Sequence, residues 1–174
     1  VSSFESYLSS CEYVVHIAAS TSVWPGRNEL VNRINIEGTR NVMTASQRAR
    51  IKRFIHVGSA NSFDPGTLEN LGTEANGYTG WKYKNDYLDS KYKTQLMLLG
   101  EFKKNKFPVI IISPTFMLGP YDSGPTSGRL LLSMVEGKVP GYSKGVKNFV
   151  HAKDVAKAIA NAMTMGRLGE AYIA

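Results

Sequence analysis

A tyrosine and a lysine stand four positions apart, as Tyr87 and Lys91, in the stretch YLDSKYKTQ. On a helix, residues four apart lie on one face and one turn from each other. A phenol with its ordinary pKa of about 10 is a poor base at neutral pH, but a neighbouring ammonium group lowers that pKa because it favours the phenolate. The pair can therefore carry a proton in acid–base catalysis, although Tyr-x-x-x-Lys alone is more typical of a helix surface.

Ser59 follows the apolar run RFIHV and offers a hydroxyl group at the end of a predicted strand. Brought close to Tyr87 in space, this hydroxyl could hold the oxygen of a carbonyl or an alcohol beside the phenol. Together with Lys91, these groups are what a protein needs to move a proton while a hydride moves to or from a nicotinamide ring. No G-x-S-x-G sequence surrounds Ser59, so the serine is not predicted to be the nucleophile of an α/β-hydrolase.

Short apolar runs alternate along the chain with segments of helical periodicity. The runs predict buried strands at 12–19, 53–60, 107–113, 148–151 and 170–174. Helical spacing predicts helices at 28–49, from about 81 to 104, at 129–135 and at 154–165, the last with Asp154 as its N-cap. Continuously apolar strands separated by helices indicate an α/β fold with a doubly wound parallel sheet, Rossmann-like and incomplete at both ends.

Small residues recur where three of the predicted strands end. In doubly wound sheets, ligands bind beyond the carboxyl ends of the strands, and small residues there let a flat ligand or a backbone approach closely. The residues at these positions are Ala18, Ala19 and Ser20, then Gly58, Ser59 and Ala60, and then Ser113, Pro114 and Thr115. Three such ends together favour a ligand site at this edge of the sheet.

The composition narrows the class of protein. Hydrophobic residues make up 43% of the 174 residues and charged residues 20%, the balance of a globular protein. The single cysteine, Cys11, excludes an internal disulfide and fits a reducing compartment, so a cytoplasmic location is predicted. No apolar run has the length of a membrane helix, and the net charge of +7 is not gathered on a face interleaved with aromatic residues. Neither a membrane nor a nucleic acid is therefore expected as a partner.

The histidines and aromatic residues have more than one interpretation. His16, His56 and His151 lie far apart in the sequence, each in or beside an apolar strand, and we interpret them as core side chains satisfied by backbone. No Cys or His cluster has the spacing of a zinc site, so no metal is predicted. Four aromatic residues near the tyrosine–lysine pair either wall an apolar substrate pocket or pack the long helix against the sheet: Tyr78, Trp81, Tyr83 and Tyr87.

Six segments together resemble a known superfamily. Taken in order, these are YVVHIAA, NIEGTRNV, FIHVGSA, YLDSK, SPTFMLGP and NFVHAKDVAKA. They resemble the extended short-chain dehydrogenase/reductase superfamily, of the NAD-dependent epimerase/dehydratase type, and most of all its dihydroflavonol-reductase-like branch. The resemblance covers nearly the whole chain. It implies NAD or NADP as the cofactor, a small-molecule substrate and a possible homodimer formed through two long helices.

The resemblance also implies a role for individual residues. Ser59 matches the serine that orients the substrate, Tyr87 the catalytic acid or base, and Lys91 the lysine that lowers the tyrosine's pKa and bonds the nicotinamide ribose. Asn35 matches an asparagine that supports the strands of the active site. The residues implied to contact the cofactor are Ala18, Ala19, Ser20, Tyr87, Lys91, Pro114 and Thr115. Residues 1–114 would be the C-terminal part of a dinucleotide-binding domain, and 115–174 a mixed segment that contributes to substrate binding and returns to the sheet.

The chain departs from the family pattern at informative places. The glycine-rich phosphate loop, and the residue that separates NAD from NADP, would lie before Val1, which suggests a fragment of a longer enzyme. Ala60 and Asn61 stand where sugar-nucleotide dehydratases have an Asp-Glu pair, which argues against elimination chemistry. The leading prediction is an NAD(P)-dependent oxidoreductase that interconverts a secondary alcohol and a ketone. The alternatives are a nucleotide-sugar epimerase that uses the same residues, a non-catalytic dinucleotide-binding module, and a truncated chain without activity.

Overall fold

A parallel β-sheet forms the centre of the computed structural model, which describes residues 2–124, 126–141 and 145–174. Within these residues the sheet has four strands in the order β1, β2, β3 and β6. Their bounds are Tyr13–His16, Arg53–Val57, Val109–Ser113 and Ala171–Ile173. The register pairs His16 with His56, His56 with Ile111 and Ile111 with Ala171, so all four carboxyl ends lie at one edge.

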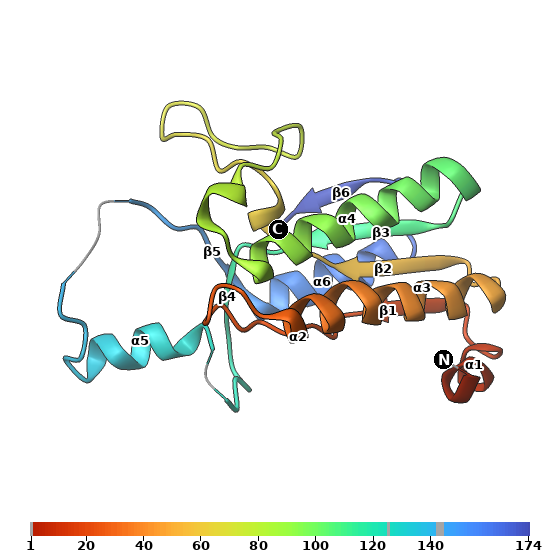
Figure 1. Ribbon diagram of the computed structural model, residues 1–174, viewed down its shortest axis with the longest axis horizontal. Helices are drawn as coiled ribbons and strands as arrows, with labels where there is room; N and C mark the ends of the chain where they lie inside the picture. Colours follow the sequence, from red (N-terminus) through yellow and green to blue (C-terminus); the bar gives the residue numbers. More distant parts are fainter. Residues whose placement is uncertain (1, 125, 142–144) are drawn as a thin grey trace.

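Helices cover both faces of this sheet (Figure 1). The helices are α1 (Ser2–Leu8), α2 (Glu29–Asn32), α3 (Gly38–Arg48), α4 (Asp86–Asn105), α5 (Gly128–Val135) and α6 (Ala152–Ala162). On one face, Met43 of α3 and Leu98 of α4 pack against Phe54 and Ile111. On the other face, α6 packs on a cluster that includes Ile55, Ile110 and Ile112. The predicted α/β fold with a doubly wound parallel sheet is confirmed.

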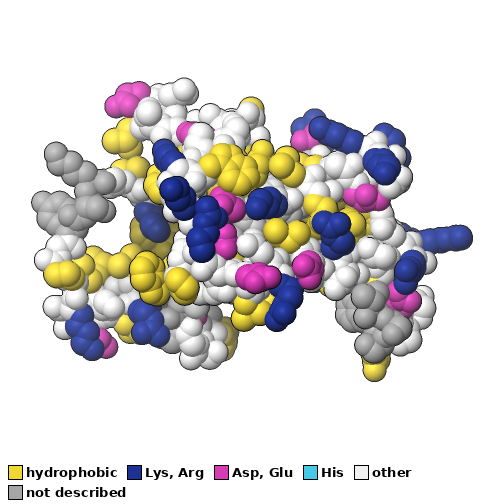
Figure 2. Space-filling view, in the orientation of Figure 1, with side chains coloured by type: hydrophobic (Ala, Val, Ile, Leu, Met, Phe, Trp, Pro, Cys, Tyr) yellow, Lys and Arg dark blue, Asp and Glu magenta, His cyan; other side chains and the backbone are white. Residues whose placement is uncertain are grey.

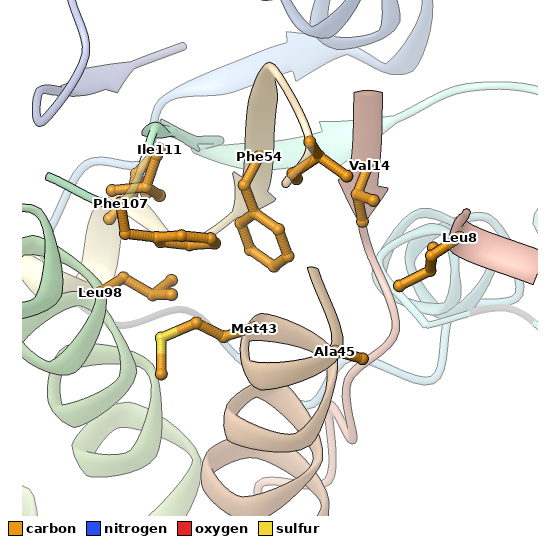
Figure 3. Packing of buried hydrophobic residues seen from close by; sticks show 10 residues of the cluster. Leu8, Val14, Met43, Ala45, Phe54, Leu98, Phe107 and Ile111 are labelled. Atoms are coloured by element: carbon orange, nitrogen blue, oxygen red, sulfur yellow. The ribbon is translucent and has the colours of Figure 1, made fainter. Parts of the chain in front are cut away.

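The central strands β2 and β3 are mostly apolar because both of their faces are covered. Phe54, Ile55, Val109, Ile110 and Ile111 are 0% exposed. Their side chains alternate between the two clusters, as the twofold period of a strand requires. Figure 3 shows Phe54, Ile111 and Phe107 meeting Leu98 and Met43 between the sheet and the helices.

Two short strands form a second, separate parallel sheet. β4 (Phe116–Leu118) pairs with β5 (Phe149–His151), and Phe116 lies opposite Phe149. β4 falls inside the Gly- and Pro-rich segment 114–128, between the predicted strand at 107–113 and the predicted helix at 129–135, where no strand was predicted. Between the two strands, α5 buries none of its residues and stands apart from the main sheet in Figure 1. The division of the chain at residue 114 stays a prediction.

The predicted helix over 28–49 is interrupted in the structure. α2 ends at Asn32, a π-helical turn follows from Arg33 to Glu37, and α3 begins at Gly38. A π-helical turn holds one more residue per turn than an α-helix and is frequent at functional sites. Asn35 lies in this turn and is 2% exposed.

The predicted N-cap of α6 is wrong. His151 occupies that position, and its Nδ1 accepts a hydrogen bond of 3.0 Å from the backbone N–H of Lys153. Asp154 is the third residue of the helix, where its carboxylate faces the positive end of the helix dipole. The sequence placed the start of the helix two residues too late because Asp is a common cap and His is not.

The surface in view carries charges of both signs (Figure 2). Figure 2 shows Asp and Glu side chains interspersed among Lys and Arg on the face in view. None of the helices that the structure describes combines the length and the apolar character needed to cross a bilayer.

Leu98 and Leu96 provide a matched pair for measuring the contribution of the α4 face of the core. Leu98 is 0% exposed, whereas Leu96, two residues earlier on the same helix, is 51% exposed. Leu98→Ala is expected to lower the free energy of unfolding by about 2–5 kcal/mol because it leaves a cavity. Leu96→Ala is expected to change it by about 0.5 kcal/mol or less. Urea unfolding of both variants measures the difference, and equal losses would contradict this packing.

Candidate active site

Ser59 lies just beyond the carboxyl end of β2. It precedes a short 3₁₀ turn, Ala60–Ser62, and its Oγ accepts a hydrogen bond of 3.2 Å from the backbone N–H of Asn61. The backbone N–H of Ala60 donates to the carbonyl oxygen of Pro114 at 2.9 Å. The segment after β2 is thus tied to the segment after β3, and Ser59 is 6% exposed.

Tyr87 is placed by the start of α4. The Oδ1 atom of Asn85 accepts hydrogen bonds from the backbone N–H groups of Tyr87 and Leu88, at 3.0 and 3.2 Å. This is an N-cap, and Asn is among the preferred residues for it. Tyr87 is therefore in the first turn of the helix, at the edge of the sheet where Ser59 lies.

Burial and the nearby Ser59 act on the Tyr87 phenol, and a substrate oxygen shared by their two hydroxyls stays a prediction. Burial raises the pKa of the Tyr87 phenol, and the interaction with Ser59 acts in the opposite direction. The sequence predicted that Lys91 would lower this pKa, and that effect of Lys91 stays a prediction, whereas the net direction is upward. Burial prevails because a phenolate loses more solvation than a phenol when it leaves water.

Lys91 lies one turn further along α4 and is 6% exposed. Its Nζ donates a hydrogen bond of 3.1 Å to the carbonyl oxygen of Val57, the last residue of β2. Burial lowers the pKa of Lys91 to about 8. Lys91 is therefore a buried ammonium group at neutral pH, held at the carboxyl end of the central strand.

The stability of the protein is expected to rise with pH because of Lys91. Between its lowered pKa of about 8 and its ordinary value of 10.5, the unfolded chain keeps the proton that the folded protein has released. The unfolded state then binds more protons, so the free energy of unfolding increases with pH in this window. Lys91→Met should flatten that increase and stabilise the protein at neutral pH, by up to about 3 kcal/mol. Urea unfolding across this pH range tests it, and parallel curves for the two proteins would contradict it.

Asn35 connects three elements at this edge. Its Oδ1 accepts from the backbone N–H of Ser20 at 2.7 Å, and its Nδ2 donates to the carbonyl oxygen of Ser20 at 3.1 Å. The same Nδ2 donates to Oγ of Ser90 on α4 at 2.9 Å. The π-helical turn thus fixes the segment after β1 to the helix that carries Tyr87 and Lys91.

The residues expected to contact a cofactor are brought to the same edge. Ala18 is exposed, and Ala19 and Ser20 are half-buried, beyond the end of β1. Pro114 is buried beyond β3, and the backbone N–H of Thr115 donates to the carbonyl oxygen of Ala174 at 2.7 Å. β1 and β3 flank β2 in the sheet, so these residues lie on either side of Ser59. Their contact with a cofactor stays a prediction.

Two buried histidines lie beside Lys91, and the sequence did not pair them. The rings of His16 and His56 stack with their centroids 5.5 Å apart. Burial lowers the pKa of both, that of His16 to about 4, and the charge of Lys91 acts in the same direction. Both are therefore neutral at pH 7. Only the register, which sets His16 opposite His56, could have revealed the pair.

The prediction that backbone satisfies these histidines is wrong. Nε2 of His16 lies 2.9 Å from Oγ1 of Thr39, whose hydroxyl donates to the carbonyl oxygen of Asn35 at 2.7 Å. Since that hydroxyl has one proton, Nε2 of His16 must carry its own. Among the described residues, neither ring nitrogen of His56 has a hydrogen-bond partner. In that same part of the chain, no group of three or more His, Cys, Asp or Glu side chains is placed to hold a metal ion.

The aromatic residues near α4 contact one another. Tyr78 stacks on Tyr92 with centroids 4.4 Å apart, and Trp81 makes T-shaped contacts with both rings, with centroids 4.6 and 5.4 Å apart. Of the two interpretations that the sequence left open, these contacts favour packing against the helix for Tyr78 and Trp81. Tyr83 is 65% exposed and lies under the ammonium group of Lys82.

A doubly wound parallel sheet with polar groups at the carboxyl ends of its strands is the architecture of dinucleotide-binding enzymes. The chain belongs to the NAD dependent epimerase/dehydratase family, whose model matches residues 2–174. The resemblance seen in the sequence is therefore confirmed.

Curated relatives include reductases and dehydratases. The chain is 25% identical to the "Putative dihydroflavonol 4-reductase" of Synechocystis sp., over 95% of this chain and 50% of that protein. It is 26% identical to the dTDP-D-glucose 4,6-dehydratase of Homo sapiens, over 92% of this chain and 46% of that protein. The chain thus spans about half the length of the curated relatives it matches.

Solved structures show the same fold. The crystal structure of gox2253 superposes with a TM-score of 0.90 at 29% identity and covers 99% of this chain and 52% of that one. PA4631, a nucleoside-diphosphate-sugar epimerase from Pseudomonas aeruginosa, gives a TM-score of 0.81 at 25% identity, over 99% of this chain and 53% of that one. DesIV, a dTDP-glucose 4,6-dehydratase from Streptomyces venezuelae with NAD and TYD bound, gives 0.79 at 22% identity and supports the fold alone.

Proposed function

We propose that this chain carries the catalytic groups of an NAD(P)-dependent oxidoreductase that interconverts a secondary alcohol and a ketone. The observation that supports this most is the hydrogen bond from Nζ of Lys91 to the carbonyl oxygen of Val57, because it holds the helix of Tyr87 and Lys91 at the end of β2, two residues before Ser59. Family membership supports the nicotinamide chemistry, because the family is NAD-dependent. The individual roles of Ser59, Tyr87 and Lys91 are also part of what we propose.

The residues at the carboxyl edge fit a nicotinamide cofactor. An ammonium group has three N–H donors, and among the described residues the carbonyl oxygen of Val57 is the hydrogen-bond partner of Lys91. The remaining donors suit the hydroxyl groups of a ribose. Small residues at Ala18 and Ala19 leave room for a flat ring system. When bound, NAD or NADP supplies the hydride acceptor, and its reduced form the hydride donor.

In the proposed reduction, Tyr87 gives its phenolic proton to the carbonyl oxygen of the substrate as that oxygen becomes an alcohol. Ser59 bonds the same oxygen and holds it beside the phenol. The charge of Lys91 stabilises the phenolate that Tyr87 leaves behind. In the oxidation the phenolate takes the proton of the alcohol, so each direction moves one proton and one hydride.

A nucleotide-sugar epimerase is the second candidate. The likeness to a nucleoside-diphosphate-sugar epimerase favours it, since epimerisation through transient oxidation needs the same three groups. Dehydratase activity is not favoured, because this chain has Ala60 and Asn61 after Ser59 and not an Asp-Glu pair. A cytoplasmic location and a homodimer also remain part of the proposal, the first because Cys11 is free and exposed.

A substrate screen tests this proposal. The full-length protein is incubated with NAD⁺ or NADP⁺ and a panel of secondary alcohols, and the absorbance of reduced nicotinamide is followed. Net cofactor reduction supports the oxidoreductase. Inversion at one carbon of a nucleotide sugar without net reduction supports the epimerase. Cofactor binding without turnover on either panel would replace both with a non-catalytic module.

A further inference from the structure

Arg27 neutralises two buried carboxylates at the start of α4. Its Nη1 lies 2.7 Å from Oδ1 of Asp86 and 3.0 Å from Oδ2 of Asp89. Asp86 is 8% exposed and Asp89 is 3% exposed, whereas the side chain of Arg27 is 59% exposed. Two carboxylates three positions apart lie on one face of a helix and repel each other unless a cation lies between them.

The other two carboxylate oxygens also accept hydrogen bonds. The backbone N–H of Asn28 donates to Oδ2 of Asp86 at 2.7 Å, and the hydroxyl of Tyr78 donates to Oδ1 of Asp89 at 2.7 Å. Burial acts to raise the pKa of Asp86, but the bonds from Arg27 and Asn28 outweigh it and leave that pKa lowered. We call Arg27, Asp86, Asp89 and Tyr78 the α4 clamp.

Further hydrogen bonds, in addition to the clamp, hold the segment after β1 against the start of α4. The backbone N–H of Asp86 donates to the carbonyl oxygen of Gly26 at 2.7 Å, and Nδ2 of Asn85 donates to the carbonyl oxygen of Val23 at 3.0 Å. A Cβ on Gly26 would lie 3.2 Å from the carbonyl oxygen of Lys84. Residues 23–28 therefore lie tightly against residues 84–89, the segment in which Tyr87 stands.

We infer that Arg27 is a positioning residue for Tyr87. Among the described residues its hydrogen-bond partners are Asp86 and Asp89, which stand immediately before Tyr87 and two positions after it. Without Arg27, Asp86 and Asp89 would face each other as buried like charges, and the first turn of α4 would shift to bring them to water. A displacement of about 1 Å at a reacting group can lower the rate about a hundredfold.

The clamp also joins two parts of the proposed site. Residues 23–28 continue the segment of Ala18, Ala19 and Ser20, which we expect to line the cofactor. Arg27 thus links that segment to the helix that carries the proton-transfer group. This inference rests on the proposed function for its kinetic consequence, but its structural consequence is independent of turnover.

Arg27→Gln tests the inference in the full-length protein. The expected result is a kcat lowered about tenfold to a hundredfold per folded molecule, with KM little changed, because positioning and not binding is lost. Amide hydrogen exchange of a peptide covering residues 84–90 should become faster at the same time. Arg40→Gln, at an exposed position on α3, is the matched control and should change neither quantity.

Two further variants separate positioning from folding. Arg27→Lys should keep most of the activity, because a single nitrogen of Arg27 makes both contacts and one ammonium group can replace it. Adding Asp89→Asn to Arg27→Gln should restore part of kcat, since one of the two buried charges is removed. The double variant is also expected to fold more readily, so its kcat can still be measured if Arg27→Gln is unstable.

Unchanged kcat per folded Arg27→Gln molecule, or no recovery in the Lys and double variants, would overturn the inference. Unchanged hydrogen exchange at residues 84–90 would overturn it even without an assay. Absence of NAD(P)-dependent turnover in the unsubstituted protein would instead count against the proposed function, while the exchange measurement would still decide whether the clamp holds α4.

Discussion

Tyr87→Phe is expected to lower kcat by about 10²- to 10⁴-fold or more, while cofactor affinity stays largely unchanged. The substitution removes the hydroxyl that exchanges the proton and keeps the ring in place. Turnover of the best substrate in the screen measures the loss, and a titration with reduced nicotinamide cofactor measures affinity.

Tyr92→Phe is the matched control for this substitution. It makes the same change five positions further along α4, where the ring stacks on Tyr78. The control should keep its activity because ring packing does not need the hydroxyl. Full turnover in Tyr87→Phe would remove Tyr87 from the proton-transfer role and the proposed mechanism with it.

Lys91→Met is the second substitution with a large expected effect, about a 10²- to 10³-fold loss in kcat/KM. The variant loses the charge that stabilises the phenolate and a donor suited to the ribose, so cofactor affinity should fall as well. This second effect distinguishes it from Tyr87→Phe. Lys93→Met, at an exposed position on the same helix, should behave like the unsubstituted protein.

The pH profile of the unsubstituted protein gives an independent check on Lys91. With its pKa lowered to about 8, the ammonium loses its proton above that pH, and kcat/KM should decline as the supporting charge disappears. The residual activity of Lys91→Met should lack this decline. An identical alkaline limb in both proteins would show that another group controls the rate.

The order of strands and helices could be predicted from the sequence because buried strands are recognisable by their runs of apolar residues. Strands covered on both faces are mostly apolar, as 109–112 are at every position, and α4 begins after an Asn that caps it. Since parallel strands end at one edge, the meeting of Ser59 with the helix of Tyr87 and Lys91 followed from the topology alone.

Features that depend on register or on the path of a loop could not be predicted. The stacking of His16 on His56 requires the pairing of β1 with β2, which single-strand patterns do not contain. The contact of Arg27 with Asp86 spans 59 positions of the chain. β4 was missed because it lies in the segment 114–128, whose glycines and prolines favour a loop.

The raised pKa of Tyr87 was missed for a different reason. A spacing of four residues indicates that an ammonium group lies on the same helix face as the phenol. It does not indicate how much water the fold removes from the phenol. The opposing effects of burial and of Ser59 on the pKa of Tyr87 depend on the folded edge of the sheet, which the sequence alone does not give.

The π-helical turn at Arg33–Glu37 makes the chain sensitive to the number of residues at this point as well as to the side chain of Asn35. Each residue of a helix advances the direction of its side chain by about 100°. The turn therefore sets the rotation of α2, which follows Arg27 in the chain, relative to α3, which packs on the sheet. Substitutions within it leave that rotation unaltered, whereas the gain or loss of one residue would rotate Asn35 away from Ser20 and Ser90 together.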